Sequence, residues 1–340
     1  MLMKVGINGF GRIGRVTYRI LRQRYPQIEV VAVNDLTDPA TLAHLLAFDS
    51  NYGPYPGKVS VDGRAIVVDD KKLPVLSEAN PANLPWREMG VDVVIESTGR
   101  FTEAEKARAH LDAGARRVLI SAPAKGEDVT IVLGVNEGDY DPERHRIISN
   151  GSCTTNALAV VVKALDEAFG VEAGLMNTVH SYTADQMLQD GPHRDLRRAR
   201  QAAQSIIPTS SGASVAIART LPKLSGRIEG FALRVPTPTV SIVDFTAVLK
   251  NRADADAVNA ALKEAAEGPL RGVLAYTDKP LVSVDYKGNP ASATVDGSLT
   301  QVVGPLAKVL AWYDNEWGYS SRLADATAYI GGIIDRRPAA

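Results

Sequence analysis

The sequence predicts an α/β protein in which a Rossmann-type, doubly wound parallel sheet is followed by an α+β catalytic domain with a mixed sheet. Three observations predict this fold. A glycine-rich turn joins a strand to a helix near the start of the chain, apolar runs alternate with helix-like stretches through the first half, and longer strand-like runs dominate the second half. A length of 340 residues exceeds what one hydrophobic core usually spans, so two domains are expected.

The glycine-rich turn has the form GxGxxG, with its three glycines at Gly9, Gly11 and Gly14. A strand-like run over residues 5–8 precedes it, and helical spacing over 16–21 follows it. Glycines in this context let the backbone turn tightly and approach a pyrophosphate, whose charge rests on the helix N-terminus. The alternative is a tight strand-to-helix turn with no ligand, and the complete strand, turn, helix and strand context favours a dinucleotide site.

A second strand over 28–33 ends at Asn34 and Asp35, and Asp35 lies 21 positions after Gly14. A carboxylate there can accept hydrogen bonds from the ribose hydroxyls and would repel a 2′-phosphate, which favours NAD over NADP. Two further strands, over 91–96 and 117–120, end in small polar residues. Ligands of doubly wound sheets lie at the carboxyl ends of the strands, so the cofactor groove is expected to include Thr98, Gly99 and Ser121.

Cys153 is the only cysteine in the chain, and it directly precedes an apolar helical run that Gly170 closes. The sulfur therefore belongs at the first turn of a helix, where unpaired N–H groups and the helix dipole favour a thiolate. The alternative is a buried structural cysteine, because free cysteine often behaves as a small hydrophobe. Its polar neighbours, Ser152, Thr154 and Asn156, favour a nucleophile.

Of the five histidines, His180 alone lies in a strand, over 175–183. Only a turn near residues 170–174 is expected to separate this strand from the Cys153 helix, so the two should run side by side. The pattern predicts a Cys/His pair in which His180 activates the thiol. The other four histidines are expected to be exposed or locally paired; they are His44, His110, His145 and His193.

Arginines crowd into residues 194–200, and Arg234 stands in a later strand. Near the hydroxyl-rich segments 181–183 and 209–212, these guanidinium groups are typical of ligands for phosphate-sized anions. The alternatives are a solvated charged face and a nucleic-acid patch. A formal net charge of −1 and the lack of interleaved aromatic residues argue against nucleic acid.

The composition, with 45% hydrophobic and 23% charged residues, is ordinary for a globular protein. The start of the chain lacks a basic region with an apolar signal core, and apolar runs are broken by charges short of a membrane span. We expect a cytoplasmic protein with no membrane partner. No CxxC, HExxH or carboxylate cluster indicates a metal.

Five segments together give the chain a resemblance to the phosphorylating glyceraldehyde-3-phosphate dehydrogenase family over essentially its full length. They are residues 4–15, 149–156, 180–183, 195–200 and 312–319. The resemblance implies an NAD-binding domain over 1–151, a catalytic domain over 152–317 and a C-terminal helix, about 318–340, that packs back on the first domain. It also implies a homotetramer that acts in glycolysis and gluconeogenesis.

The resemblance implies that Cys153 is the nucleophile and His180 its base. Besides the glycine loop and Asp35, it implies NAD contacts from Arg12, Ile13, Ser121, Asn315 and Tyr319. For the phosphate of glyceraldehyde 3-phosphate it implies Thr183 and Arg234, and for attacking inorganic phosphate it implies Ser152, Thr154, Arg198, Ser211 and Gly212.

Two other functions stay open on the sequence. An erythrose-4-phosphate dehydrogenase has a similar scaffold but hydrolyses its thioester, and the segment Ser181 to Thr183 follows the phosphorylating pattern instead. A nucleotide-fold binding protein without turnover would have lost Cys153 or His180, and both are present.

Overall fold

The computed structural model describes residues 2–334, which divide into two compact units. The first unit contains residues 2–131, 137–151 and 320–334, and the second contains 132–136 and 152–319. Residues 335–340, the end of the predicted terminal helix, lie outside the described residues. Within 2–334, no helix has the length and apolar character needed to cross a membrane.

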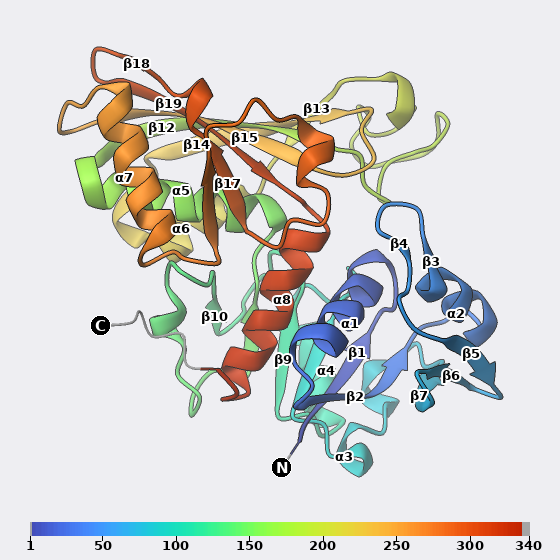
Figure 1. Ribbon diagram of the computed structural model, residues 1–340. Coiled ribbons are helices and arrows are strands. Elements are labelled where there is room, and N and C mark those ends of the chain that lie inside the picture. Colours follow the sequence, from blue (N-terminus) through green and yellow to red (C-terminus); the bar gives the residue numbers. More distant parts are fainter. Residues whose placement is uncertain (1, 335–340) are drawn as a thin grey trace. The chain divides into compact units, whose positions relative to one another are not determined.

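The first unit is built on a nine-stranded sheet in the order β10-β11-β9-β8-β1-β2-β7-β6-β5 (Figure 1). Neighbouring strands are parallel except where β6 pairs with β7 and with β5. The strands are β1 (Met3–Asn8), β2 (Ile28–Asn34), β5 (Val59–Asp62), β6 (Ala65–Val68), β7 (Lys71–Leu76), β8 (Val93–Glu96), β9 (Arg117–Ile120), β10 (Val129–Thr130) and β11 (Ile147–Ser149), and β3 (Phe48–Asp49) pairs separately with β4 (Gly53–Pro54).

Helices connect and cover the strands of the first unit. They are α1 (Arg12–Arg24), α2 (Pro39–Ala47), α3 (Trp86–Met89), α4 (Ala104–Asp112) and the part of α8 (Trp317–Ile330) that follows residue 319. A buried carboxylate joins α8 to the end of α1: Asp325 accepts a hydrogen bond from the Tyr25 hydroxyl and pairs with Arg24 at 2.9 Å. The terminal helix thereby belongs to the first unit.

The second unit is built on an eight-stranded mixed sheet in the order β13-β14-β12-β15-β19-β17-β16, with β18 paired to β19. Its strands are β12 (Val171–Ser181), β13 (Ile207–Ser210), β14 (Ile228–Val235), β15 (Ser241–Leu249), β16 (Leu274–Thr277), β17 (Ala293–Asp296), β18 (Gln301–Val303) and β19 (Leu306–Tyr313). Its helices are α5 (Cys153–Phe169), α6 (Ala213–Thr220) and α7 (Ala255–Glu267).

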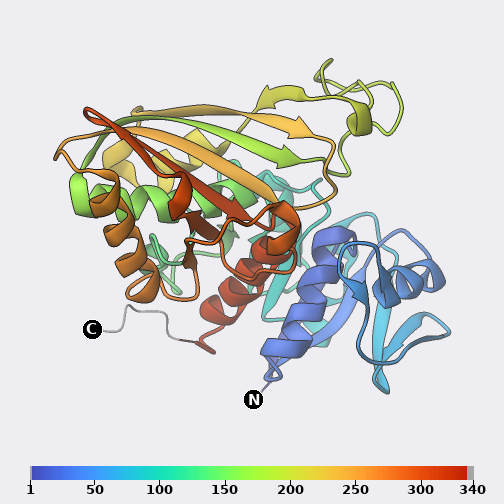
Figure 2. The same cartoon turned by 45° about the horizontal axis from the view of Figure 1, so that its top comes forward.

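The three helices α5, α6 and α7 cover one face of this sheet (Figures 1 and 2). The apolar run of α5 is fully buried because alternate residues of β12, β15 and β19 pack against it, including Met176, Phe245 and Val309. In the parallel pairing of β12 with β14, His180 lies opposite Arg234. The sheet register therefore places the predicted base beside a predicted anion ligand.

These observations confirm the predicted α/β class, with its parallel first sheet and mixed second sheet. One predicted local feature is wrong. Residues 170–174 were expected to form the turn before the histidine strand, but β12 begins at Val171, directly after Gly170. Gly174 lies inside the strand, where a Cβ atom would come within 2.5 Å of the Phe245 ring. That glycine serves close packing instead of a turn.

We expect Gly14→Ala to destabilise the first unit, because a Cβ atom there would lie 2.2 Å from the Gly9 carbonyl oxygen. Overpacking against backbone costs about 1–3 kcal/mol of unfolding free energy. Gly11→Ala is the matched control, since a Cβ atom at Gly11 meets nothing within 4 Å. Urea unfolding measures both variants, and equal stabilities would show that the contact at Gly14 is not limiting.

Candidate active site

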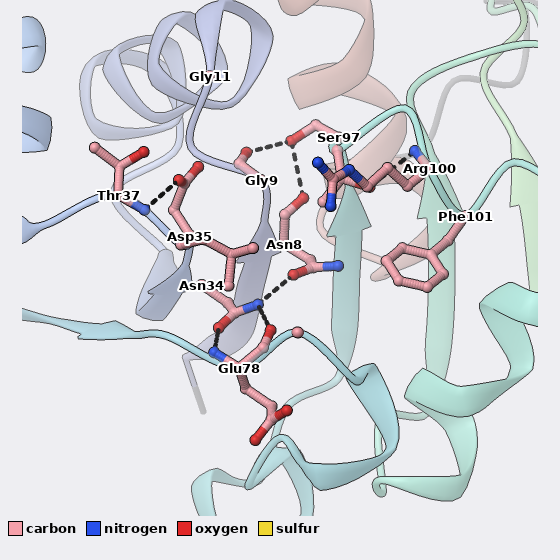
Figure 3. Close-up of a pocket in the computed structure, with 13 residues that line it drawn as sticks. Asn8, Gly9, Gly11, Asn34, Asp35, Thr37, Glu78, Ser97, Arg100 and Phe101 are labelled. Atoms are coloured by element: carbon pink, nitrogen blue, oxygen red, sulfur yellow. Dashed lines mark hydrogen bonds between the residues drawn. The ribbon is translucent and has the colours of Figure 1, made fainter.

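A pocket in the first unit opens at the carboxyl ends of β1, β2 and β8. Four residues predicted to bind the cofactor line it, namely Gly9, Gly11, Asp35 and Thr98, and so does Ala79. The Asp35 carboxylate accepts a hydrogen bond from the Phe10 N–H at 2.8 Å. It accepts another from the Thr37 N–H at 3.0 Å (Figure 3). It thus fixes the glycine-rich loop as well as lining the pocket.

The loop itself fits a dinucleotide. Gly9 has φ +91°, and a Cβ atom there would lie 2.6 Å from the Thr98 nitrogen, so only glycine fits. Gly11 faces open space where a ligand can approach the backbone. The N–H groups of the first turn of α1 follow immediately, and helix N-termini favour phosphate groups. NAD is the cofactor that these residues suit.

The other predicted cofactor residues of the first unit lie around this pocket without lining it. Arg12 and Ile13 open α1, and the Arg12 guanidinium forms an ion pair with Asp49. Burial opposes ionisation of Asp49, but Arg12 holds the pKa of that carboxyl below its usual range. Gly99 and Ser121 follow the ends of β8 and β9.

A buried polar network that the sequence did not predict supports the pocket floor. His110, expected to be exposed or locally paired, is fully buried, and its Nε2 atom lies 3.0 Å from Glu96 Oε2. The Trp86 indole donates to His110 Nδ1 at 3.0 Å, so the ring proton must sit on Nε2 and face Glu96. Glu96 also accepts hydrogen bonds from Asn8 and Thr98, and thereby ties β1 to the loop after β8.

In the second unit, the predicted cysteine and histidine meet. Cys153 is the first residue of α5, and the Ser152 hydroxyl caps the helix by accepting the Thr155 N–H. The Cys153 sulfur lies 3.4 Å from His180 Nε2, within hydrogen-bond reach. The thiol is half-buried, whereas the imidazole is buried.

Hydrogen bonding assigns the tautomer of His180. Its Nδ1 atom lies 2.7 Å from the Ser181 carbonyl oxygen, a short contact that requires a proton on Nδ1. The lone pair of Nε2 then faces the Cys153 sulfur. The Arg234 guanidinium lies 3.1 Å from Nδ1 and also donates to the Ser181 carbonyl at 3.3 Å. The imidazole is therefore arranged to accept the thiol proton.

Burial and charge set the protonation states of this pair. Burial, together with the nearby Arg234 cation, lowers the pKa of His180 to about 3. Burial also raises the pKa of the Cys153 thiol, and Arg234 and the N–H groups of the helix start oppose this shift without cancelling it. The expected lowering of the thiol pKa by the helix start is thus outweighed, and the pair is neutral. Attack by the sulfur needs His180 as a proton acceptor.

A buried tyrosine that sequence reasoning did not single out holds the two elements together. The Tyr313 hydroxyl, from the end of β19, lies 2.9 Å from the Thr154 hydroxyl and 2.7 Å from the Thr178 hydroxyl. It joins the first turn of α5 to β12, and its ring meets the His180 ring edge to face. Inward alternation along β19 is the signal that could have indicated it.

Asn315 belongs to the second unit and lies close to the histidine strand. Its Oδ1 atom accepts hydrogen bonds from the Ser181 hydroxyl at 2.9 Å and the Ser241 hydroxyl at 3.1 Å. Val240, just before Ser241, has φ +70°, a strained conformation for a β-branched residue that favours a functional role. Tyr319 is buried in α8.

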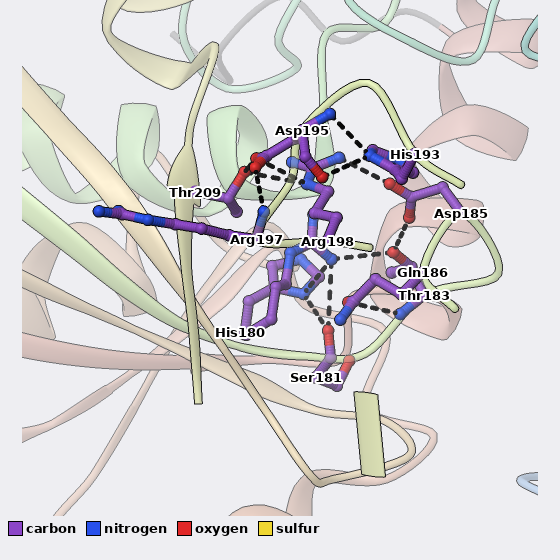
Figure 4. Close-up of polar contacts among 11 residues, drawn as sticks. His180, Ser181, Thr183, Asp185, Gln186, His193, Asp195, Arg197, Arg198 and Thr209 are labelled. Carbon is purple, nitrogen blue, oxygen red and sulfur yellow. Dashed lines mark hydrogen bonds and ion pairs between the residues drawn. The ribbon is translucent and has the colours of Figure 1, made fainter. Parts of the chain in front are cut away.

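Figure 4 shows a cluster of arginines, hydroxyls and carboxylates beyond the end of β12. Arg234 donates to the Thr183 hydroxyl at 3.0 Å, so the two residues predicted for the substrate phosphate do meet. Arg198 donates through Nε to the Thr209 hydroxyl at 2.9 Å and through Nη1 to Asp185 at 2.6 Å. Asp185 was not predicted, although an acid between Thr183 and the arginine segment is a visible signal.

The remaining predicted phosphate ligands make hydrogen bonds within the second unit. Ser152 caps α5, and the Thr154 hydroxyl faces Tyr313. Ser211 and Gly212 precede α6, where the Ser211 hydroxyl accepts the Ala213 N–H at 3.3 Å. Within residues 2–334, no group of three or more histidine, cysteine or acidic side chains could hold a metal ion.

A Rossmann-type unit with a dinucleotide pocket and an α+β unit with a cysteine–histidine pair define an NAD-dependent oxidoreductase. Sequence models of known families agree. The NAD binding domain of glyceraldehyde 3-phosphate dehydrogenase matches residues 3–104, and the C-terminal domain of that enzyme matches residues 152–315. The chain therefore belongs to the glyceraldehyde-3-phosphate dehydrogenase family.

Three relatives illustrate the similarity. Glyceraldehyde-3-phosphate dehydrogenase of Geobacillus stearothermophilus is 58% identical over 331 residues, which cover 97% of this chain and 98% of the relative. Glyceraldehyde-3-phosphate dehydrogenase 2 of Streptomyces arenae is 56% identical over 334 residues, with 98% and 100% coverage. Glyceraldehyde-3-phosphate dehydrogenase 1 of Bacillus subtilis is 56% identical over 331 residues, with 97% and 98% coverage.

We expect Tyr313→Phe to lower the free energy of unfolding by about 1–3 kcal/mol, because it removes one partner from two buried hydroxyls. Tyr286→Phe is the matched control. The Tyr286 hydroxyl is buried with no hydrogen-bond partner among the described residues, so its removal should change little. Urea unfolding compares the two, and a similar loss in both would contradict the role of the Tyr313 hydroxyl.

We expect Asp35→Asn to increase the use of NADP relative to NAD by roughly tenfold. The amide oxygen can accept from only one of the two N–H groups that the carboxylate binds, and the negative charge that opposes a 2′-phosphate is removed. The ratio of kcat/KM for the two cofactors measures the change. Glu78→Gln, which removes another carboxylate from the same pocket, is the control. An equal shift in that variant would show that the position of Asp35 is not decisive.

Proposed function

We propose that this protein oxidises glyceraldehyde 3-phosphate to 1,3-bisphosphoglycerate with NAD, through a thioester on Cys153. The observation that carries this mechanism is the 3.4 Å contact between Cys153 Sγ and His180 Nε2, with Nδ1 held by the Ser181 carbonyl. It supports a nucleophile with its own proton acceptor. The family membership supports the substrate and the cofactor.

The first step forms a bond between Cys153 Sγ and the aldehyde carbon while the thiol proton passes to His180 Nε2. The alkoxide formed by this attack takes the proton back from His180 Nε2 to give the hemithioacetal. The hemithioacetal hydroxyl then returns that proton to Nε2 as a hydride leaves the same carbon. NAD supplies the hydride acceptor when bound, held by the loop of Gly9, Gly11, Arg12, Ile13 and Gly14, by Asp35, Thr98, Gly99 and Ser121, and by Asn315 and Tyr319.

The second half-reaction releases the acyl group. A phosphate oxygen attacks the thioester carbon, the bond from that carbon to Cys153 Sγ breaks, and an acyl phosphate leaves. The N–H of Cys153 at the start of α5 and the His180 ring are the donors proposed for the oxyanion. This step regenerates the cysteine and keeps the energy of aldehyde oxidation in the product.

Two anion sites serve these steps. Thr183 and Arg234 would bind the phosphate of the substrate, and their mutual hydrogen bond supports the assignment. Inorganic phosphate would be bound by Ser152, Thr154, Arg198, Ser211 and Gly212. Because the hydroxyls of Ser152 and Thr154 already have partners, phosphate there would rely most on the Arg198 guanidinium and on the N–H groups at the start of α6.

We also propose a homotetramer in the cytoplasm. Self-association is supported by the face of the second sheet that points away from its helices. That face exposes apolar side chains, which on a monomer usually mark a contact surface. They include Leu175, Phe231, Val303 and Leu306.

The reaction is tested by the absorbance of reduced nicotinamide with glyceraldehyde 3-phosphate, with and without inorganic phosphate. We expect sustained turnover only with phosphate and a burst of one equivalent per active site without it. Cys153→Ser should abolish both, and His180→Asn should slow them by roughly 10² to 10⁴, the usual contribution of a general base. His44→Asn, at an exposed position of α2, is the control.

Sustained turnover without phosphate would mean that water releases the acyl group, as in an erythrose-4-phosphate dehydrogenase. Full activity of Cys153→Ser would exclude the thioester route.

A further inference from the structure

Asp185 places a carboxylate among the groups proposed to bind phosphate (Figure 4). One oxygen accepts a hydrogen bond from the Thr183 hydroxyl, and the other accepts a hydrogen bond from Arg198 Nη1 at 2.6 Å. Thr183 belongs to the proposed site for the substrate phosphate, and Arg198 to the proposed site for inorganic phosphate. One internal anion therefore bridges the two sites.

The bridge occupies the only hydrogen-bond donor of the Thr183 hydroxyl. A threonine hydroxyl has a single proton to donate. The Thr183 oxygen accepts from Arg234 Nη1 at 3.0 Å, and its proton goes to Asp185. A phosphate oxygen can receive that proton only after the bond to Asp185 has broken.

The guanidinium of Arg198 is similarly engaged. Its Nε atom donates to the Thr209 hydroxyl at 2.9 Å, and that hydroxyl donates to Asp195 Oδ2 at 2.7 Å. Asp195 itself is 3.8 Å from Arg198, so Asp185 is the nearer carboxylate. Asp185 therefore occupies a donor of this guanidinium, at Nη1, that a bound anion could otherwise use.

The carboxyl of Asp185 is ionised at neutral pH. Burial opposes the charge, but the Thr183 hydroxyl and the cations of Arg234 and Arg198 hold the pKa of Asp185 below its usual range. A phosphate that enters this site therefore encounters the negative charge of the Asp185 carboxylate, which is already bound to Thr183 and Arg198.

We propose that Asp185 is a specificity-determining residue whose carboxylate competes with the ligand phosphate for Thr183 and Arg198. The inference rests on the proposed function for the identity of the ligand. A carboxylate offers one charge and two oxygens, whereas a phosphate dianion offers more of both. A dianion can displace Asp185, and a monoanion such as acetate cannot do so efficiently. The site thereby selects phosphate over the singly charged anions of similar size.

Asp185→Asn tests this competition, because the amide keeps the shape of the side chain and removes its charge. The measured quantity is the Kd for inorganic phosphate, by calorimetry on the full-length protein without substrate. We expect the Kd to fall by about three- to tenfold, since the apparent affinity scales with the fraction of sites that the internal anion leaves free. Inhibition of turnover by acetate should become stronger, and the KM for NAD should stay constant.

Two further variants make the test specific. Asp190→Asn removes a carboxylate of the same segment that pairs with Arg200, and it should leave the Kd for phosphate unchanged. In the double variant Asp185→Asn with Arg198→Leu, the gain in affinity should disappear, because the competition acts on Arg198. A gain that persists would exclude Arg198 as the contested group.

An unchanged or weaker affinity in Asp185→Asn, with an unchanged melting temperature, would overturn the proposal and make Asp185 a positioning residue for Arg198. The binding measurement needs no catalysis. Failure of the proposed function would instead appear as turnover that is independent of Cys153, so the two failures are distinguishable.

Discussion

The chemistry of the second unit depends on how the first turn of α5 is held against β12. The Tyr313 hydroxyl bridges Thr154 on the helix and Thr178 on the strand, inside a core where unpaired hydroxyls are costly. Because Thr154 follows Cys153 and Thr178 lies two residues before His180, this bridge sets the distance between sulfur and imidazole. A shift of one element relative to the other would remove the proton acceptor from the nucleophile.

Charge around the imidazole follows from the register of the sheet. The parallel pairing of β12 and β14 places Arg234 beside His180, and the guanidinium disfavours a second positive charge there. The imidazole is thus kept neutral, with the lone pair of Nε2 facing Cys153. The same guanidinium contacts Thr183, so one cation serves both the base and the proposed substrate phosphate. Asp185 offsets part of the positive charge that remains.

In the first unit, buried hydrogen bonds keep the ends of the parallel strands rigid where the backbone lines a pocket. Glu96 is buried at the end of β8 and receives hydrogen bonds from neighbouring strands and loops. His110 completes its set of donors, with its tautomer fixed by Trp86. A fully satisfied buried network of this kind rigidifies its surroundings. The glycine-rich loop can then present bare backbone without losing its shape.

The sequence by itself determined the parts that depend on neighbours along the chain. The turn at Gly9 to Gly14, the carboxylate after β2 and the position of Cys153 at a helix start all follow from local spacing and backbone sterics. The tertiary structure alone decided the protonation of the Cys153–His180 pair, the bridge of Tyr313 and the carboxylate of Asp185 among the arginines. These depend on burial and on contacts between residues as far apart as 159 positions, which no local pattern encodes.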